Sequence, residues 1–349
     1  YIFKLLVTRI FIVNININVN GGNIVENNMA IEYPMFCYQC EQTAGGKGCT
    51  KMGVCGKTPE VAALQDLLIY QIKGISCYAK ELVEKGENVD KDIVSFIEDT
   101  LFTTLTNVNF DADVHVEMLK KSQKIKEALR SKVGSIKNNT DHATYNLSDT
   151  KAEMLKDAKK AGIMYDQNLD PDIRSLRQTI IYGLKGISAY GHQARALGYY
   201  DDQVDNFYVR ALEATTDDNL DVEELIRWTM RTGDMSVAVM KKLDEANTTV
   251  YKNPSPQKVN VHVKKGPFII VSGHDLKDLD MLLKQTEGKG INISTHGEMI
   301  PSHGYPELKK YPHLVGNFGG AWQDQQKEFD DIPGCILMTT NCLMRPRET

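Results

Sequence analysis

Two ten-residue segments that lie far apart in this chain are almost the same. Residues 69–78 read IYQIKGISCY and residues 181–190 read IYGLKGISAY, with seven identical positions in one register. The separation is too long for the unit of a solenoid, so the pair does not belong to a stacked array. Chance similarity between amphipathic helices is the alternative, and seven identities in ten disfavour it. The repeat predicts two related helical bundles in tandem.

The sequence around the first copy is that of an amphipathic helix. Thr58 is a suitable N-cap, Pro59 stands at the first helical position, and Gly86 marks the end. Between them, apolar residues recur at steps of three and four, which predicts one buried stripe. The same patterns predict further helices at about 90–107, 114–133, 149–162, 171–197, 202–213 and 221–246.

Two features of the repeat predict how its helices pack. Gly74 and Gly186 stand in mid-helix, where glycine lowers helix propensity, so we expect each to allow a close helix crossing. Cys77 in the first copy corresponds to Ala189 in the second. A cysteine that alternates with alanine on such a stripe is expected to be a small buried side chain.

The sequence pattern changes after residue 252. Residues 253–265 contain two prolines and are predicted to be a linker. Short apolar runs then alternate with helical patterns, which predicts a parallel sheet with right-handed crossovers. We expect three strands, at 267–273, 291–297 and 334–342, and helices at 274–290 and 325–333.

The predicted fold class is therefore multidomain, α followed by α/β. A helical domain of two related bundles occupies 29–252, and a Rossmann-like parallel α/β domain occupies 266–349. Three strands leave a bare sheet edge, so we expect the second domain to be incomplete at its C-terminus. Cys335 falls inside the third predicted strand and is expected in the core. Residues 1–28 resemble translated AT-rich DNA, and we expect them to be a non-native upstream extension.

Composition excludes some classes of partner. The net charge of −5 and the pI near 6.0 give no electrostatic basis for nucleic-acid binding. Lys4 and Arg9 interrupt the apolar N-terminal run, so no membrane span is predicted. Seven cysteines in a chain of 349 residues do not suit a disulfide-stapled mini-domain. We expect reduced thiols and a cytoplasmic protein.

Four of the cysteines lie in one glycine-rich stretch, the four-cysteine loop (residues 37–55). Cys37, Cys40, Cys49 and Cys55 have the spacing C-x2-C-x8-C-x5-C. Four thiolates suit either tetrahedral zinc or a [4Fe–4S] cluster. Structural zinc usually shows two separated C-x2-C pairs, whereas this loop has one pair and two single cysteines. The spacing favours the iron–sulfur cluster, and zinc is the alternative.

Three further side chains with metal-ligand chemistry follow the predicted strands. His274 follows the first strand, Glu298 the second, and Cys342 ends the third. The carboxyl ends of parallel strands share one edge, so the three are expected to converge there as the His–Glu–Cys cluster. Nitrogen, oxygen and sulfur donors together suit a mixed cluster with oxygen and sulfur bridges. The alternatives are a surface His, a solvated Glu and a buried thiol, with His296 and His303 as competing ligands.

Several long motifs together resemble one known family, the hybrid cluster proteins, also called prismane proteins or hydroxylamine reductases. The resemblance covers residues 35–349. It rests on the Lys-Gly-Ile-Ser repeat and on CYQCEQTAGGKGCTKMGVCGK, VSGHDL, THGEMIPSHGYPEL, LVGNFGGAW and ILMTTNC.

The resemblance implies two metal clusters. Cys37, Cys40, Cys49 and Cys55 would hold a [4Fe–4S] cluster that passes electrons inward. His274, Glu298 and Cys342 would be the first three ligands of a hybrid [4Fe–2O–2S] cluster. The other ligands of that cluster in the family are further cysteines, a glutamate and a lysine. They would lie beyond Thr349, so the chain as given is not expected to assemble the second cluster.

The resemblance also implies an activity. Family members reduce hydroxylamine to ammonia and water, and nitric oxide to nitrous oxide, with electrons from a partner redox protein. From the chemistry of the side chains themselves, we expect Glu298 to be a labile ligand, because a carboxylate can shift, and His303 to be a proton donor. A carbon monoxide dehydrogenase-like enzyme is the alternative enzyme. An iron–sulfur electron carrier or redox sensor, and a zinc-stabilised helical protein, are the non-enzymatic alternatives.

Overall fold

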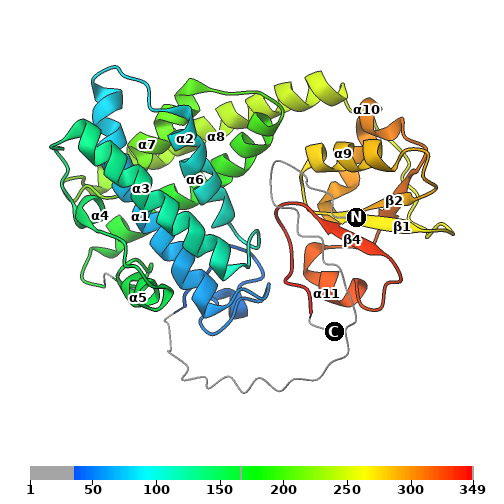
Figure 1. Cartoon of the computed structure of the whole chain (residues 1–349), viewed down its shortest axis with the longest axis horizontal. Helices are drawn as coiled ribbons and strands as arrows, with labels where there is room; N and C mark the ends of the chain where they lie inside the picture. Colours follow the sequence, from blue (N-terminus) through cyan, green and yellow to red (C-terminus); the bar gives the residue numbers. More distant parts are fainter. Residues whose placement is uncertain (1–34, 166, 348–349) are drawn as a thin grey trace. The chain divides into compact units, whose positions relative to one another are not determined.

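The computed structural model describes residues 35–165 and 167–347 (Figure 1). The predicted extension at 1–28 lies outside the described residues. The chain forms two compact units that divide between Val250 and Tyr251. The first unit is helical and the second contains all the strands described, so the protein is mostly helical with a small parallel sheet.

The helical unit follows the sequence pattern closely. Thr58 caps the first helix by accepting a hydrogen bond from the backbone N–H of Val61 at 3.2 Å, and Pro59 stands at the first helical position. A short helix at 141–144 was not predicted. The helices are α1 (Pro59–Glu84), α2 (Lys91–Thr103), α3 (Ala112–Val133), α4 (Asp141–Thr144), α5 (Lys151–Asp157), α6 (Pro171–Ala196), α7 (Asp202–Ala214) and α8 (Val222–Tyr251).

The two copies of the repeat lie in α1 and α6, and the two glycines behave differently. A Cβ on Gly74 would lie 2.1 Å from the carbonyl oxygen of His142. The lack of a side chain at Gly74 therefore allows the backbone of α4 to approach α1 closely. A Cβ on Gly186 would meet no atom within 4 Å, so the predicted close crossing there is wrong. Cys77 and Ala189 are both buried, as predicted.

The second unit is built on a four-stranded parallel sheet. The strands have the spatial order β3-β2-β1-β4, which makes β3 and β4 the edges. Helix α9 (Leu276–Thr286) connects β1 to β2 and buries Leu279 and Leu283 completely. The strands are β1 (Phe268–Ser272), β2 (Asn292–His296), β3 (Leu314–Phe318) and β4 (Cys335–Met338).

The second unit corrects three predictions. The prediction of three strands was wrong, because LVGNF forms a fourth strand, β3. The segment has no alternation of apolar and polar residues, so the sequence pattern did not indicate a strand there. Cys335 is exposed rather than in the core, because it is the first residue of the edge strand β4. The predicted helix at 325–333 is only α11 (Gln325–Glu328).

The predicted linker packs along the outer side of β3. The backbone N–H of Asn317 donates to the carbonyl of Asn260 at 2.8 Å. A Cβ on Gly316 would lie 2.2 Å from that same carbonyl oxygen, so only glycine allows the approach. The segment therefore satisfies part of an edge that would otherwise be open.

Candidate metal centres

The four-cysteine loop is closed by a backbone bridge between two of its cysteines. Cys37 and Cys49 exchange both backbone hydrogen bonds, at 3.1 and 2.8 Å. The chain between them turns through Gly45 and Gly46, whose φ angles of 61° and 66° favour glycine. This turn directs backbone N–H groups toward the thiols.

The Cys49 thiol receives the most hydrogen bonds. The N–H of Ala44 lies 3.4 Å from its Sγ, and the hydroxyl of Thr43 lies 3.7 Å away. Burial acts to raise the pKa of this thiol. Hydrogen bonds from the backbone of Ala44 and Val54 and from Thr43 outweigh it, so the pKa is lowered overall. Such donors stabilise a thiolate, the form that binds metal.

The thiols of the loop lie close enough that the negative charge of one thiolate raises the pKa of another. Burial raises the pKa of Cys40, and the neighbouring Cys37, Cys55 and Cys49 raise it further. Among the residues that the structure describes, however, no three of these thiols bring their sulfur atoms within 4.8 Å of one another. The loop therefore gathers four thiols that influence one another, as a candidate metal centre.

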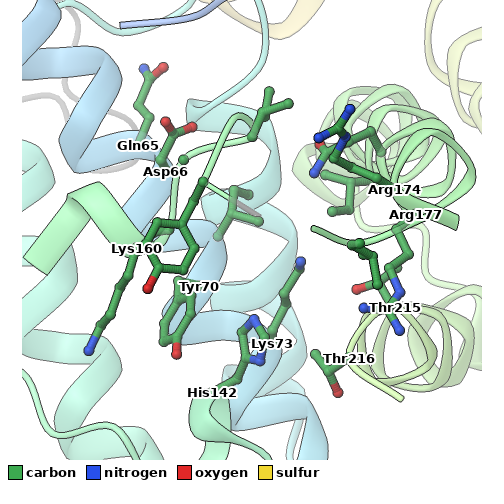
Figure 2. Close-up of a pocket in the computed structure, with 18 of the residues that line it drawn as sticks. Gln65, Asp66, Tyr70, Lys73, His142, Lys160, Arg174, Arg177, Thr215 and Thr216 are labelled. Carbon is green, nitrogen blue, oxygen red and sulfur yellow. The ribbon is translucent and has the colours of Figure 1, made fainter. Parts of the chain in front are cut away.

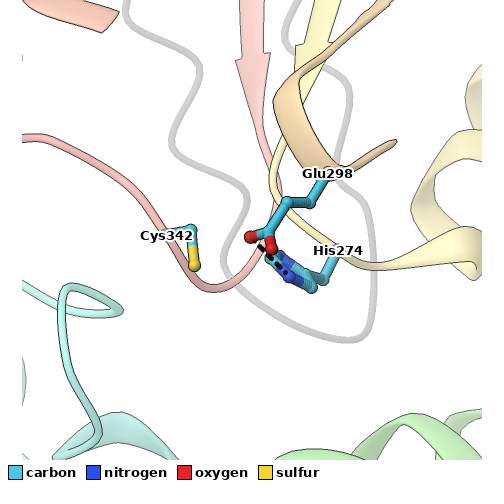
Figure 3. Close-up of side chains that lie close together, drawn as sticks. All are labelled: His274, Glu298 and Cys342. Carbon is cyan, nitrogen blue, oxygen red and sulfur yellow. Dashed lines mark ion pairs between the residues drawn. The ribbon is translucent and has the colours of Figure 1, made fainter. Parts of the chain in front are cut away.

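The His–Glu–Cys cluster forms at the carboxyl edge of the sheet. His274, Glu298 and Cys342 follow β1, β2 and β4, three adjacent strands. Figure 3 shows their side chains directed at one another, and one ligand atom of each lies within 4.8 Å of the others. The His274 Nε2 and Glu298 Oε2 atoms are 3.1 Å apart.

The side chain of Thr339 holds the backbone next to this cluster in place. Its hydroxyl oxygen accepts hydrogen bonds from the backbone N–H groups of His274 and Asp275, at 3.1 and 3.3 Å. Gly273 has a φ of 113°, and a Cβ there would lie 2.2 Å from the same oxygen. Cys342 itself has a φ of 50°, a left-handed conformation that is uncommon for cysteine. The turn after β1 and the segment after β4 are therefore held together.

The donor set suits a metal site. The Nδ1 of His274 is buried and has no hydrogen-bond partner, while the Nε2 faces the carboxylate. The side chain of Glu298 is 59% exposed, so its carboxylate is accessible to a ligand or to solvent. Nitrogen, oxygen and sulfur atoms at one point, with room around them, can share a mixed metal cluster.

The two competing histidines lie outside this cluster. His296 is fully buried, and its ring nitrogens contact Glu328 at 2.8 Å and Ser272 at 3.0 Å. His303 is buried with its Nε2 3.0 Å from the Thr295 hydroxyl, and burial lowers its pKa. Both rings serve the packing of the sheet, and the structure gives His303 no contact with the His–Glu–Cys cluster.

A second group of potential ligands was not predicted. Glu98 and Asp99 of α2 meet His192 of α6 with their ligand atoms within 4.8 Å. Arg195 already neutralises them: its Nε lies 3.1 Å from Glu98, and its Nη2 contacts Asp99. This group is therefore an ion-pair network between two helices. No local signal could reveal it, because its members come from distant parts of the sequence.

A loop of four thiols and a convergent His–Glu–Cys set, on a helical unit and a parallel α/β unit, define a metal-cluster protein. The chain belongs to the Prismane/CO dehydrogenase family, whose model matches residues 35–349. The family prediction is confirmed. Among the residues described, no helix is long and apolar enough to cross a membrane.

Similar proteins are named hydroxylamine reductases. Those of Syntrophobacter fumaroxidans, Desulfitobacterium hafniense and Desulfovibrio desulfuricans are 49%, 47% and 46% identical to this chain over 90% of its length. The chain spans 57–58% of the length of these relatives. Carbon Monoxide Dehydrogenase IV from Carboxydothermus hydrogenoformans matches 87% of this chain and 45% of its own, at 15% identity and a TM-score of 0.27. A similarity at that level supports no conclusion about fold or function.

Proposed function

We propose that the intact protein reduces hydroxylamine to ammonia and water, a reaction that consumes two electrons and two protons. The observation that carries this proposal is the His–Glu–Cys cluster, with its ligand atoms within 4.8 Å at the edge of the sheet. The name of the relatives, at 46–49% identity, supports the same substrate. Nitric oxide has no separate support in the geometry.

In this proposal each ligand set holds its own cluster. Cys37, Cys40, Cys49 and Cys55 hold a [4Fe–4S] cluster, supported by their spacing and by the N–H···S contact from Ala44 to Cys49. His274, Glu298 and Cys342 hold part of a hybrid [4Fe–2O–2S] cluster. When bound, that cluster supplies an open iron position and electrons for cleavage of the N–O bond.

The chain's own residues contribute binding and proton handling. The exposed carboxylate of Glu298 would be able to shift and carry a proton, because the contact that the described residues give it is the one with His274 at 3.1 Å. His274 is fixed through its backbone by Thr339, so it keeps its position if the carboxylate moves.

The surface of the four-cysteine loop suits a redox partner. The side chains of Tyr38, Met52 and Val54 are exposed around the buried thiols of Cys49 and Cys55. Exposed apolar side chains close to an electron entry point favour transient docking of a carrier protein. Four cysteines grouped as metal ligands need a reducing environment, so a cytoplasmic location is part of the proposal.

The finer description of the fold is also part of the proposal. Helices α1 and α6 both have 26 residues, begin with proline and have a capping side chain before it, Thr58 or Asp170. They start and end at equivalent positions of the repeat. This agreement supports two related bundles, and the parallel sheet with α9 as a crossover supports a Rossmann-like second domain.

The first test is the metal content of the 349-residue chain purified without oxygen. We expect about four iron atoms and about four sulfide ions per chain, with the EPR signal of a reduced [4Fe–4S] cluster. Cys40→Ala should lose both, and Cys335→Ala, an exposed cysteine, should keep them. Zinc without sulfide would contradict the iron–sulfur proposal.

The second test is activity of the intact protein. Ammonia should form from hydroxylamine with a reduced dye as electron donor, and Glu298→Gln should lower the rate. An intact protein that holds both clusters but forms no ammonia would instead be an electron carrier.

A further inference from the structure

The helical unit contains a cavity of about 630 Å³, which reaches one predicted metal ligand, Cys37, at its wall. Figure 2 shows side chains from α1 and α6 directed into it, together with residues near α4 and after α7. Six lysine and arginine side chains line it, against three aspartates among the residues described. This volume lies in the usual range of small-molecule pockets.

Lys73 of α1 lies in this cavity without a counter-ion. Its side chain is half-buried, and among the residues described no hydrogen bond or ion pair reaches its ammonium group. Burial and, after it, the nearby positive charge of Arg177 bring its pKa down to about 8. Arg177 on α6 thus acts on Lys73 as a like charge from another helix that lines the cavity.

Arg177 of α6 is only partly neutralised. Its side chain is 12% exposed, and its Nη2 donates to the carbonyl of Asp217 at 2.8 Å and to Asp218 at 2.9 Å. Its Nε is buried and has no partner. Asp218 is 82% exposed, so solvent weakens the compensation that it provides.

The surrounding groups do not neutralise this pair of cations. Burial lowers the pKa of His142, and the charges of Lys73 and Arg177 act in the same direction. The imidazole is therefore neutral and cannot compensate the two cations. Asp66 makes no ion pair with another residue that the structure describes, and burial raises the pKa of its carboxyl despite the lysines around it. The cavity therefore keeps an excess of positive charge.

Two cations that face each other in a buried space cost free energy unless an anion lies between them. We propose that this cavity binds a small oxyanion, of the phosphate or sulfate class, between Lys73 and Arg177. Thr215 and Thr216 line the same wall (Figure 2), but their hydroxyls already donate to backbone carbonyls at 2.7 Å each, so the two cations carry the proposed contact. The oxyanion is either free or the charged end of a larger ligand, since the cavity exceeds the size of one such ion.

The site is independent of the proposed reductase activity, because it uses none of the seven predicted metal ligands as an anion contact. It can therefore be tested on the 349-residue chain by calorimetric titration with inorganic phosphate, at an ionic strength held constant with chloride. We expect saturable binding at one site and an upward shift of the melting temperature with phosphate. Chloride alone should give neither.

Variants separate this site from surface binding. Lys73→Met and Arg177→Gln should each weaken phosphate binding on the order of tenfold or more, the usual effect of losing a charged hydrogen bond. Lys124→Met, at an exposed lysine of α3, should leave it unchanged. Circular dichroism checks that each variant is folded, and Lys73→Arg should retain binding because the charge is kept.

Two results would overturn the proposal. One is a wild-type chain that binds phosphate no better than chloride. The other is a folded Lys73→Met variant that binds phosphate as well as the wild type. If phosphomonoesters bind at least ten times more tightly than inorganic phosphate, with the same loss in Lys73→Met, the oxyanion belongs to a larger ligand.

Discussion

The imidazole Nε2 of His274 lies 3.1 Å from the carboxylate of Glu298, although the two residues follow different strands. The contact exists because β1 and β2 are parallel neighbours and end at the same edge of the sheet. Cys342, after β4 on the other side of β1, brings a thiol to the same point. The topology of three adjacent strands thus assembles three kinds of donor atom.

This assembly predicts metal binding that depends on Cys342. Added Co²⁺ should give a thiolate charge-transfer absorption, part of which disappears in Cys342→Ser. Cys335→Ser is the matched control, since that thiol is exposed in the same strand region and lies outside the cluster. Equal spectra for Cys342→Ser and the wild type would show that the three side chains do not bind metal together.

Thr43 is expected to tune the reduction potential of a cluster in the four-cysteine loop. Its hydroxyl lies 2.9 Å from the carbonyl oxygen of Cys37 and 3.7 Å from the Cys49 sulfur, so its one proton is shared between these two acceptors. Hydrogen bonds to cluster sulfurs raise the potential, so Thr43→Val should lower it in an EPR-monitored titration. Thr50→Val, at an exposed position of the loop, should leave the potential unchanged.

The two glycines of the repeat should respond oppositely to alanine. Gly74→Ala should lower the free energy of unfolding by about 1–3 kcal/mol, because its Cβ would clash with the backbone carbonyl of His142. Gly186→Ala has open space and should raise it by up to about 1 kcal/mol through helix propensity. Urea denaturation of both variants measures the difference. Equal effects would mean that α4 does not pack on α1 as described.

These two glycines also show which parts of the helix packing could be predicted from the sequence. Helix α1 was predicted from its cap and its apolar stripe, because those signals are local. The role of Gly74 was only half predicted, since its contact comes from a four-residue helix that has no periodicity to detect. Gly186 shares the motif but not the neighbour, so sequence identity could not show that its space is open.

The two ligand sets were accessible from the sequence for different reasons. The four cysteines are close along the chain, so their spacing alone indicated a site. The positions of His274 and Cys342 followed from strand ends, which the apolar runs marked well enough even though β3 was missed. The pairing of Lys73 with Arg177 was not accessible, because it depends on how two long helices pack.

The ion-pair network between α2 and α6 predicts how stability changes with pH. Burial raises the pKa of Glu98 to about 7. For His192, burial acts to lower the pKa, but the hydrogen bond with Asp99 outweighs it and the pKa is raised. Both groups therefore bind more protons in the folded than in the unfolded state at pH 5–7, so the free energy of unfolding should fall as pH rises through this range.

Glu98→Gln isolates this contribution, because glutamine keeps the size of the side chain and cannot lose a proton. The slope of unfolding free energy against pH, measured by urea denaturation at pH 5, 6 and 7, should become less negative by up to about 1.4 kcal/mol per pH unit. Glu223→Gln, at an exposed glutamate of α8, should leave the slope unchanged. A Glu98→Gln variant with the wild-type slope would show that this carboxyl is already ionised across the range, and that Arg195 compensates its burial fully.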